Sequence, residues 1–516
     1  MTDFGPNPQP SATFIGSFAL VGRVAERVAA LAQILVVASL FGSGLAADQY
    51  FIASIVPLML GSVLGEAFAA AALPALERAR GRQVVEWAAS GLWLVAATLA
   101  AATLAYAVAA TIFVQVATPA GSAALLWLVF ATITFTLGLS GYLGAVLLRY
   151  ERYVWPPFRL ATAALAGLAF TVVAALFSDD VVWIAAGVAG GYAVSVVLML
   201  AEIGTVAGGS WLRRPTREGT SELLRQRRNA ASAVASGLIG GQLFVLMERA
   251  RAATLGVGAV ATLSYARGTV FSPNAVGQAI AAGVYPGMVR SYAAERRDDV
   301  VERLVRALRL TVFVGIPFLV FFEAFGTEVA ALIFERGAFD TRDAAVVGDT
   351  VNALAPALLG NLLLIVAWRT LYAIDYFRAT VWSMLTVLAV YGATASPFRA
   401  EWGVTGLAAA FSVAELAGGL VAVSLAVRRI APRPREVFRH GLVPAVTGGA
   451  LVGITIVTYR LVLGAVDVAV PLQSVVHVGG AVGVGTAAAA VVLWRSGWPE
   501  VDRLKRFLRQ RLGLAA

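Results

Sequence analysis

The sequence predicts an all-α integral membrane protein of about fourteen transmembrane helices, arranged as two parallel six-helix lobes with an appended helix pair. Three observations predict this class: an apolar composition, long apolar runs between arginine clusters, and an internal repeat. Of the 516 residues, 59% are hydrophobic and 14% are charged. A soluble domain carries about 25% charged residues to cover its surface, so a bilayer is the expected solvent.

The apolar runs end at glycine, proline and arginine clusters, which sets the expected spans. The first series lies near residues 14–40, 49–76, 84–112, 122–148, 155–177, 181–206, 229–254 and 258–289. The second series lies near residues 303–325, 344–371, 379–396, 402–427, 439–461 and 472–494. Residues 1–13 contain no Lys or Arg, so we expect the first span to be retained rather than cleaved as a signal peptide.

Arginines gather in alternate loops and predict the orientation. The loops at 78–82, 149–152, 213–228, 290–297 and 428–439 are basic, and the tail 498–516 is basic as well. The intervening loops are uncharged or acidic. The positive-inside rule therefore places both termini in the cytoplasm. The net charge of +10 is an orientation signal and an attraction to anionic lipids, and it does not indicate nucleic-acid binding.

The two halves of the chain repeat each other. Residues 65–78 read GEAFAAAALPALER and residues 277–290 read GQAIAAGVYPGMVR, 212 positions later. The predicted organisation is an N-lobe of spans 1–6 (residues 1–206), a basic cytoplasmic linker (207–228), a C-lobe of spans 7–12 (229–427), spans 13–14 (428–497) and a basic cytoplasmic tail (498–516). Parallel repeats of this kind are typical of transporters that bind substrate near the bilayer midplane.

Several residue counts exclude particular kinds of enzyme chemistry. The chain has no cysteine, so thiolate catalysis and thiolate metal sites are excluded. Its two histidines, His440 and His477, are too far apart for a HExxH site. Lys505 is the single lysine and follows no glycine-rich loop, which excludes a Walker A nucleotide site. We expect a transporter without a cofactor or metal.

One stretch points to a family. Residues 332–340 read LIFERGAFD, which resembles the LFERGAF motif of the MurJ/MviN lipid II flippases of the multidrug/oligosaccharidyl-lipid/polysaccharide exporter superfamily. Weaker resemblances occur in the same order at residues 40–48, 265–267, 371–375 and 403–408. The resemblance implies a fourteen-helix transporter of the bacterial plasma membrane. It further implies that spans 13 and 14 form a groove for a lipid tail.

Charged residues inside the expected spans are the candidate substrate-binding residues, because each costs about 2.5–3.5 kcal/mol at the bilayer centre. In span 1, Arg23 and Glu26 are spaced to pair on one helix face. Arg27 falls at the position of the cavity arginine of the family that the sequence resembles. The alternative for Arg27 is a structural pair with Glu26, Asp48 or Glu66.

Other candidates come from the same resemblance. Asp48 matches the acid of span 2, with a helix N-cap as its alternative. Glu66 and Arg267 each lie one residue away from the family's charged position. The family's arginine pair in span 2 has no counterpart, since residues 58–61 read LMLG. This absence weakens the assignment of lipid II as cargo more than it weakens lipid-linked glycan transport.

Span 7 carries Glu248, Arg249 and Arg251 near its outer end. They are candidates for a periplasmic gate, with snorkelling to the interface as the alternative. We expect Glu415 to be hydrogen-bonded inside the bundle, or to bind Na⁺ or H⁺ if it is buried. His477 is expected to be a packed histidine of the lipid groove.

The leading hypothesis is an alternating-access flippase that moves a polyprenyl-diphosphate-linked cell-wall precursor, lipid II first, to the outer leaflet for peptidoglycan synthesis. A flippase for another lipid-linked oligosaccharide, a cation-coupled small-molecule exporter and a non-transporting cell-wall scaffold are the alternatives. Without a nucleotide site, we expect the energy for transport to come from the membrane potential, from a Na⁺ or H⁺ gradient, or from removal of the product. The expected partners are the lipid-linked glycan, membrane lipids and cell-wall synthesis proteins, around a monomer.

Overall fold

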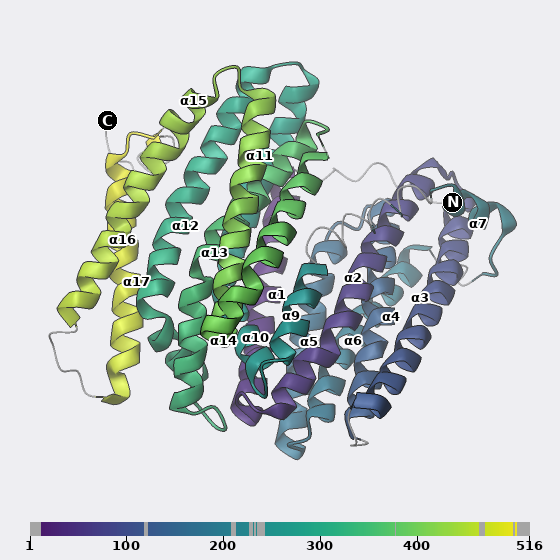
Figure 1. Ribbon diagram of the computed structural model, residues 1–516. Helices are drawn as coiled ribbons and strands as arrows, with labels where there is room; N and C mark the ends of the chain where they lie inside the picture. The colour runs from purple at the N-terminus through teal and green to yellow at the C-terminus, as the bar shows by residue number, and fades with distance from the viewer. Residues whose placement is uncertain are drawn as a thin grey trace, which may run out of the picture. The chain divides into compact units, whose positions relative to one another are not determined.

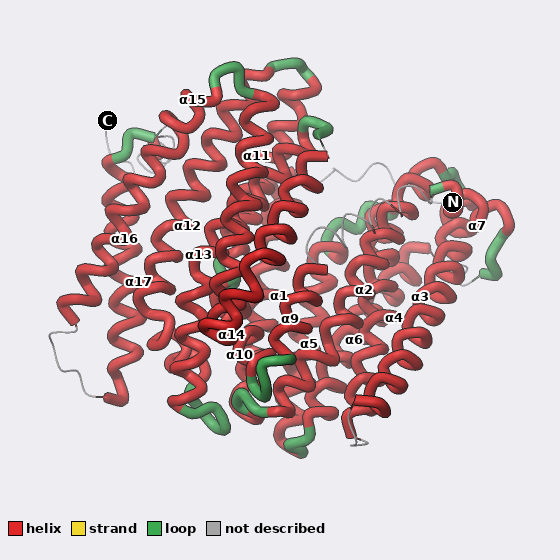
Figure 2. The backbone as a smooth tube through the Cα atoms, viewed as in Figure 1, coloured by secondary structure: helices red, strands yellow, loops and turns green. Residues whose placement is uncertain are grey.

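A computed structural model describes residues 12–117, 122–207, 213–226, 243–376, 378–463 and 470–498, together with residues 231, 234, 501 and 502. Within these residues the regular secondary structure is helical throughout and contains no strand (Figure 2). The predicted all-α class is therefore confirmed for the described part of the chain. Most of the predicted linker 207–228 is described, whereas residues 503–516 of the predicted tail lie outside the described residues.

Two compact units divide the chain. Unit 1 comprises Met1–Ser264 and Arg336–Phe339, and unit 2 comprises Tyr265–Glu335 and Asp340–Ala516. The division falls inside one helix, because α10 runs from Ala259 to Val270. Each unit is described by itself below.

Unit 1 is built from long helices that are coloured purple to blue in Figure 1, with shorter teal helices at its end. Its helices are α1 (Ala12–Phe41), α2 (Leu45–Arg78), α3 (Arg82–Ala117), α4 (Ser122–Arg149), α5 (Trp155–Phe177), α6 (Val181–Ala207), α7 (Arg217–Arg225), α9 (Leu243–Ala253) and the first part of α10. Helices α2, α4 and α6 pack together, and α5 packs between α1 and α6. The loops α2–α3 and α4–α5 lie at one end of the unit, and these loops and the helix ends beside them contain five arginines, so we call this the basic end.

Unit 2 contains the remaining helices, coloured green to yellow in Figure 1. They are the end of α10, α11 (Asn274–Ala293), α12 (Arg297–Phe334), α13 (Thr341–Ala373), α14 (Arg378–Ile430), α15 (Pro434–Val437), α16 (Val443–Leu463) and α17 (Val470–Arg495), with a π-helical turn at Phe438–Leu442. Helix α13 packs against α11, α12 and α14, while α16 packs on α12 and α17.

Eleven helices in the described residues are long and apolar enough to span a membrane. Helix α14 covers two expected spans, 379–396 and 402–427. Its backbone departs from helical geometry at Gly403, near the start of the second span, where φ is 58°. Expected span 8 (258–289) is interrupted between α10 and α11 at residues 271–273, next to Pro273. Most of the first half of expected span 7, residues 229–242, lies outside the described residues. The count of fourteen therefore stays a prediction.

Helices α2 and α4 cross at a backbone-to-backbone contact made by glycines. A Cβ atom added to Gly141 would lie 2.5 Å from the carbonyl oxygen of Gly65. A Cβ added to Gly65 would lie 3.2 Å from the carbonyl oxygen of Gly138. Any side chain at this crossing would separate the helices, so the glycines determine where Glu66, the next residue on α2, is held.

An ion pair joins the appended helices to α12. Arg460 Nη1 on α16 lies 2.7 Å from Glu328 Oε1 on α12. His477 on α17 is 9% exposed, and its Nδ1 lies 3.9 Å from the same oxygen. His477 is buried as predicted, but it faces a carboxylate, which the sequence did not indicate because Glu328 is far from it in the chain.

Substitution of Gly141 tests the glycine crossing. Gly141→Ala forces α2 and α4 apart, and overpacking of this kind typically costs about 1–3 kcal/mol. We expect a lower thermal unfolding midpoint for the detergent-purified protein. Gly144→Ala on the same helix is the matched control, because its Cβ would meet atoms no nearer than 3.8 Å. Equal unfolding midpoints for the two variants would contradict the prediction.

Candidate functional site

Charged residues of α1, α2 and α5 form a cluster in unit 1 toward its basic end. The predicted pair on α1 is present, with Arg23 Nη1 and Glu26 Oε2 3.1 Å apart. Gly22 allows α1 to approach α5 closely, since a Cβ there would lie 3.0 Å from the carbonyl oxygen of Pro157. This approach brings Arg23 close to the first turns of α5.

A residue that the sequence analysis did not single out completes the cluster. Arg159 on α5 donates from Nη1 to Ser140 Oγ on α4 at 3.0 Å. Its carbonyl oxygen accepts a hydrogen bond from Ser195 Oγ on α6 at 2.8 Å. The charged groups that act on the Arg159 guanidinium are Arg23, Glu66 and Glu26. The signal was present in the sequence, as one arginine four residues inside an apolar run that starts at Trp155.

Glu66 and Arg27 complete the charges of this region. Both side chains are exposed on unit 1, and among the described residues neither forms an ion pair. Arg27 lies one turn along α1 from Arg23, on the same face. With Arg23, Arg159 and Glu26, these residues make a cluster of three arginines and two glutamates, which has one net positive charge.

Asp48 has a different setting from this cluster. Its Oδ2 accepts a hydrogen bond from the backbone N–H of Gly258 at 2.6 Å, and its Oδ1 accepts one from Ala261 at 2.7 Å. The carboxylate therefore caps the first turn of α10, where N–H groups lack partners within their own helix. The side chain is 5% exposed. The N-cap alternative describes this geometry, although the capped helix is α10 and not α2.

The candidate gate residues lie on α9. Glu248 is fully buried, and Arg249 is half-buried. Arg249 Nη1 donates to the carbonyl oxygen of Val260 at 2.6 Å and to the hydroxyl of Ser264. Arg249 thus ties α9 to α10, and Arg251 lies half-buried one turn from Glu248. Burial of Glu248 does not fit snorkelling to an interface, so these residues fit an internal tie between helices better.

Arg267 belongs to unit 2, at the end of α10. Its guanidinium carbon lies 4.4 Å from the centroid of the Phe411 ring and 5.5 Å from that of Phe271. An arginine over an aromatic face is attracted by the ring quadrupole, by about 0.5–2 kcal/mol depending on exposure. Arg267 is therefore a half-buried cation held by aromatic rings.

A chain of polar side chains links α11, α13 and α14 in unit 2. Asn274 Nδ2 donates to Asn361 Oδ1 at 3.0 Å, and Asn361 Nδ2 donates to Glu415 Oε2 at 3.3 Å. Glu415 is 7% exposed, so it is buried and hydrogen-bonded within the bundle, as expected. In the described part of the chain, no group of three or more His, Asp or Glu side chains could hold a metal ion.

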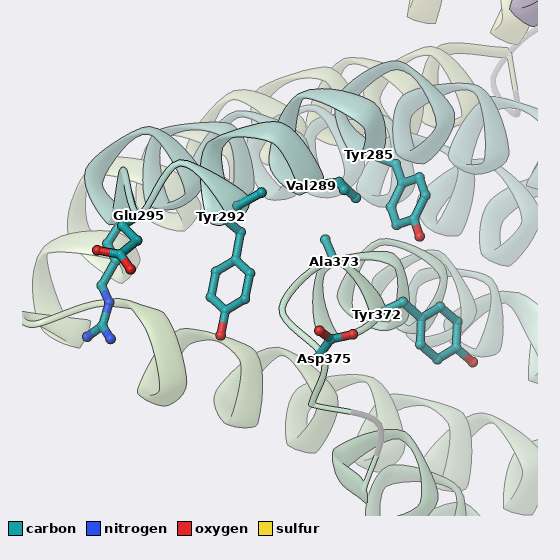
Figure 3. Close-up of a pocket in the computed structure, with 9 residues that line it drawn as sticks. Tyr285, Val289, Tyr292, Glu295, Tyr372, Ala373 and Asp375 are labelled. Atoms are coloured by element: carbon teal, nitrogen blue, oxygen red, sulfur yellow. The ribbon is translucent and has the colours of Figure 1, made fainter.

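Unit 2 also contains a cavity of about 820 Å³ at the ends of α11 and α13 (Figure 3). Tyr285, Tyr292 and Tyr372 line it together with Glu295 and Asp375. The side chains of Tyr292 and Asp375 extend into the space between the two helix ends. Arg297 also lines the cavity, so its lining contains two carboxylates and one guanidinium and carries a net charge of −1.

The sequence of the chain matches a known protein family. The sequence profile of the family described as "Lipid II flippase MurJ" matches residues 37–470, which is most of the chain. The chain belongs to the MurJ family. Members of the MurJ family are membrane flippases and not enzymes, which agrees with the exclusions made from the residue counts.

Solved structures share the fold of this MurJ family member. A lipid II flippase MurJ in an inward closed conformation has a TM-score of 0.72 at 15% identity, covering 92% of this chain and 97% of that one. An inward-facing multidrug resistance MATE family transporter of the MOP superfamily has a TM-score of 0.63 at 15% identity, with 80% and 96% covered. A MOP superfamily transporter from Pyrococcus furiosus has a TM-score of 0.56 at 15% identity, with 83% and 96% covered.

The cap made by Asp48 predicts a stability effect. Asp48→Ala leaves two backbone N–H groups at the start of α10 without their acceptor, which should cost roughly 2 kcal/mol. Asp48→Asn keeps one acceptor oxygen and should cost less. Thermal unfolding of the purified protein measures both. A cost for Asp48→Asn equal to or above that of Asp48→Ala would show that the two hydrogen bonds are not what the residue contributes.

Proposed function

We propose that this MurJ family member moves lipid II, the polyprenyl-diphosphate-linked precursor of peptidoglycan, from the inner to the outer leaflet by alternating access. The family match over residues 37–470 carries the proposal. The cationic cluster in unit 1 supports it, because a diphosphate headgroup needs fixed positive charge at membrane depth. With the orientation that the arginine-rich loops predict, the cluster lies in the cytoplasmic half of its unit, where the headgroup starts.

Arg27 and Arg23 are the proposed diphosphate ligands on α1. Arginine suits this task because its planar guanidinium binds phosphate oxygens through two parallel hydrogen bonds. Glu26 already holds Arg23, so binding of the diphosphate competes with an existing ion pair. Because the cluster has a net charge of only +1, we expect it to bind the headgroup weakly enough for the headgroup to be released, which transport requires. Arg267 in unit 2 is a further proposed headgroup ligand, while Asp48 is proposed to be structural.

The isoprenoid tail is proposed to lie along α16 and α17. A groove of about 470 Å³ runs between them, lined by Leu451, Thr455, Val484, Ala487, Ala488, Val491 and Val492. An apolar groove at the surface of a membrane helix pair can hold an acyl or isoprenoid chain while the headgroup moves. Membrane lipids would occupy the same groove when no substrate is bound.

Transport is proposed to draw on the membrane potential or an ion gradient. Moving one charge across 100 mV is worth about 2.3 kcal/mol, which is enough to bias a transport cycle. The buried Glu415 is the carboxylate best placed to exchange a proton or bind Na⁺ within unit 2. The same residue favours a second candidate function, a cation-coupled small-molecule exporter. A Na⁺- or H⁺-dependent efflux of small molecules, with no lipid II movement, would support that alternative.

The protein is proposed to act as a monomer in the bacterial plasma membrane with both termini in the cytoplasm. Cell-wall synthesis proteins that consume lipid II on the outer face would remove its product and draw the cycle forward.

Arg27→Ala tests the function directly. Loss of this cation removes charge-assisted hydrogen bonds to the diphosphate, so we expect the rate of lipid II flipping in proteoliposomes to fall by about tenfold or more. Arg80→Ala, in the loop at the basic end, is the matched control and should keep the rate. Equal amounts of protein in the liposomes must be verified. Wild-type protein that moves no lipid II would refute the function, and a fully active Arg27→Ala variant would support a role other than headgroup binding for Arg27.

The groove yields a second prediction. Ala488→Trp fills the space between α16 and α17, so flipping of lipid II with its full-length isoprenoid chain should slow. Val482→Trp, on α17 at an exposed position outside the groove lining, serves as control. Comparison of long-chain and short-chain lipid II analogues measures the effect. A loss that is equal for both chain lengths would argue against a tail-binding groove.

A further inference from the structure

Arg159 is a charged residue inside a membrane-spanning helix, four residues after α5 begins at Trp155. An arginine at the centre of a span costs about 2.5–3.5 kcal/mol on insertion scales. Arg159 lies nearer the end of its helix, where the cost is smaller, but a half-buried guanidinium still needs polar partners. Arg159 forms fewer hydrogen bonds with the protein than its guanidinium can donate.

Two neighbouring helices, α4 and α6, hold Arg159 in place. Ser140 on α4 accepts a hydrogen bond from the guanidinium, and Ser195 on α6 donates one to the Arg159 carbonyl. Both serines are buried, at 3% and 1% exposed. The arginine is therefore fixed at both its backbone and its side chain.

Most of its hydrogen-bonding capacity is unused. A guanidinium has five N–H donors in a rigid fork. Ser140 takes one of them, and among the described residues no carboxylate lies within 4.0 Å of the guanidinium. A structural arginine inside a membrane protein is normally paired with an acid or with several carbonyl groups. Arg159 is half-buried, so its remaining donors can be reached by a ligand.

The neighbouring charges leave room for an anion. Arg23 repels Arg159, while Glu66 and Glu26 attract it from beyond ion-pair distance. Glu26 is already bound to Arg23. A ligand with two or more negative charges would relieve the repulsion between the two arginines and bind the free donors of Arg159.

Helix α2 cannot supply this charge itself. Residues 58–61 contain no cation, and a Cβ on Gly61 would lie 3.0 Å from the Leu137 Cβ of α4. Met59 is buried as well. An arginine at position 61 would be forced into the contact between α2 and α4.

We propose that Arg159 is a diphosphate-binding residue, positioned by Ser140, which supplies from α5 the cation that α2 lacks. The proposal rests on the proposed function for the identity of the cargo. It goes further in making α5 part of the binding site, and in assigning to Arg159 the preference for a diphosphate over a monophosphate. The alternative is that Arg159 only links α4, α5 and α6.

Binding of prenyl phosphates distinguishes a diphosphate-binding role of Arg159 from a purely structural one. The full-length protein in detergent is titrated with geranylgeranyl diphosphate and with geranylgeranyl monophosphate, and the ratio of the two dissociation constants is measured. Arg159→Gln should weaken diphosphate binding by about ten- to a hundredfold and monophosphate binding much less, so that the ratio collapses. Arg159→Lys keeps the charge without the fork and should retain part of the preference.

Two further variants complete the design. Ser140→Ala keeps Arg159 but removes the hydrogen bond that positions its guanidinium, and should weaken diphosphate binding by a few-fold. This variant tests the proposal even if Arg159→Gln does not fold. Arg152→Gln is the matched control, because Arg152 pairs with Glu202 at 3.4 Å outside the cluster. It should leave the ratio unchanged.

The outcomes distinguish this proposal from the proposed function. If Arg159→Gln lowers thermal stability but keeps the wild-type ratio, Arg159 is only a structural link and the proposal is overturned. If the ratio depends on Arg159 while the wild-type protein moves no lipid II, the diphosphate site stands and the proposed cargo does not. If lipid II is moved equally by wild type and Arg159→Gln, the function stands and the role of Arg159 is refuted.

Discussion

The cost of placing a full charge in a bilayer determines how the polar residues of this protein are arranged. Each charged side chain within a span must either meet a partner in its own unit or remain available for a ligand. Arg460 meets Glu328, and Asp48 meets two backbone N–H groups. Among the described residues, Arg159 donates a side-chain hydrogen bond to one serine hydroxyl. For these three residues, the number of polar partners separates the structural residues from the candidate ligand.

The helices could be predicted because their signal is local. Expected span 155–177 coincides with α5, and expected span 181–206 differs from α6 by one residue. The pair Arg23–Glu26 was predictable for the same reason, since both residues lie on one turn. The break of expected span 8 near Pro273 was missed, because the apolar run continues through it and the run was weighed more heavily than the proline.

Contacts between distant segments could not be predicted from one sequence. Asp48 caps a helix that begins 211 residues later, and no local pattern announces such a pair. Arg159 was overlooked because one arginine near the start of a span resembles a residue that reaches the interface, and only its bond to Ser140 shows that it points into the unit. The glycine contact could not be predicted either, because a sequence rich in glycine does not reveal that Gly65 and Gly141 are the ones in contact.

Helix α10 is short, and the division between the two units falls within it. Its first turn is fastened to α2 by the two hydrogen bonds of Asp48, and Arg267 lies about 12 Å further along the same rod. The two hydrogen bonds of Asp48 therefore fix the start of α10 to α2, and the backbone hydrogen bonds of α10 fix the spacing between that point and Arg267 along the helix.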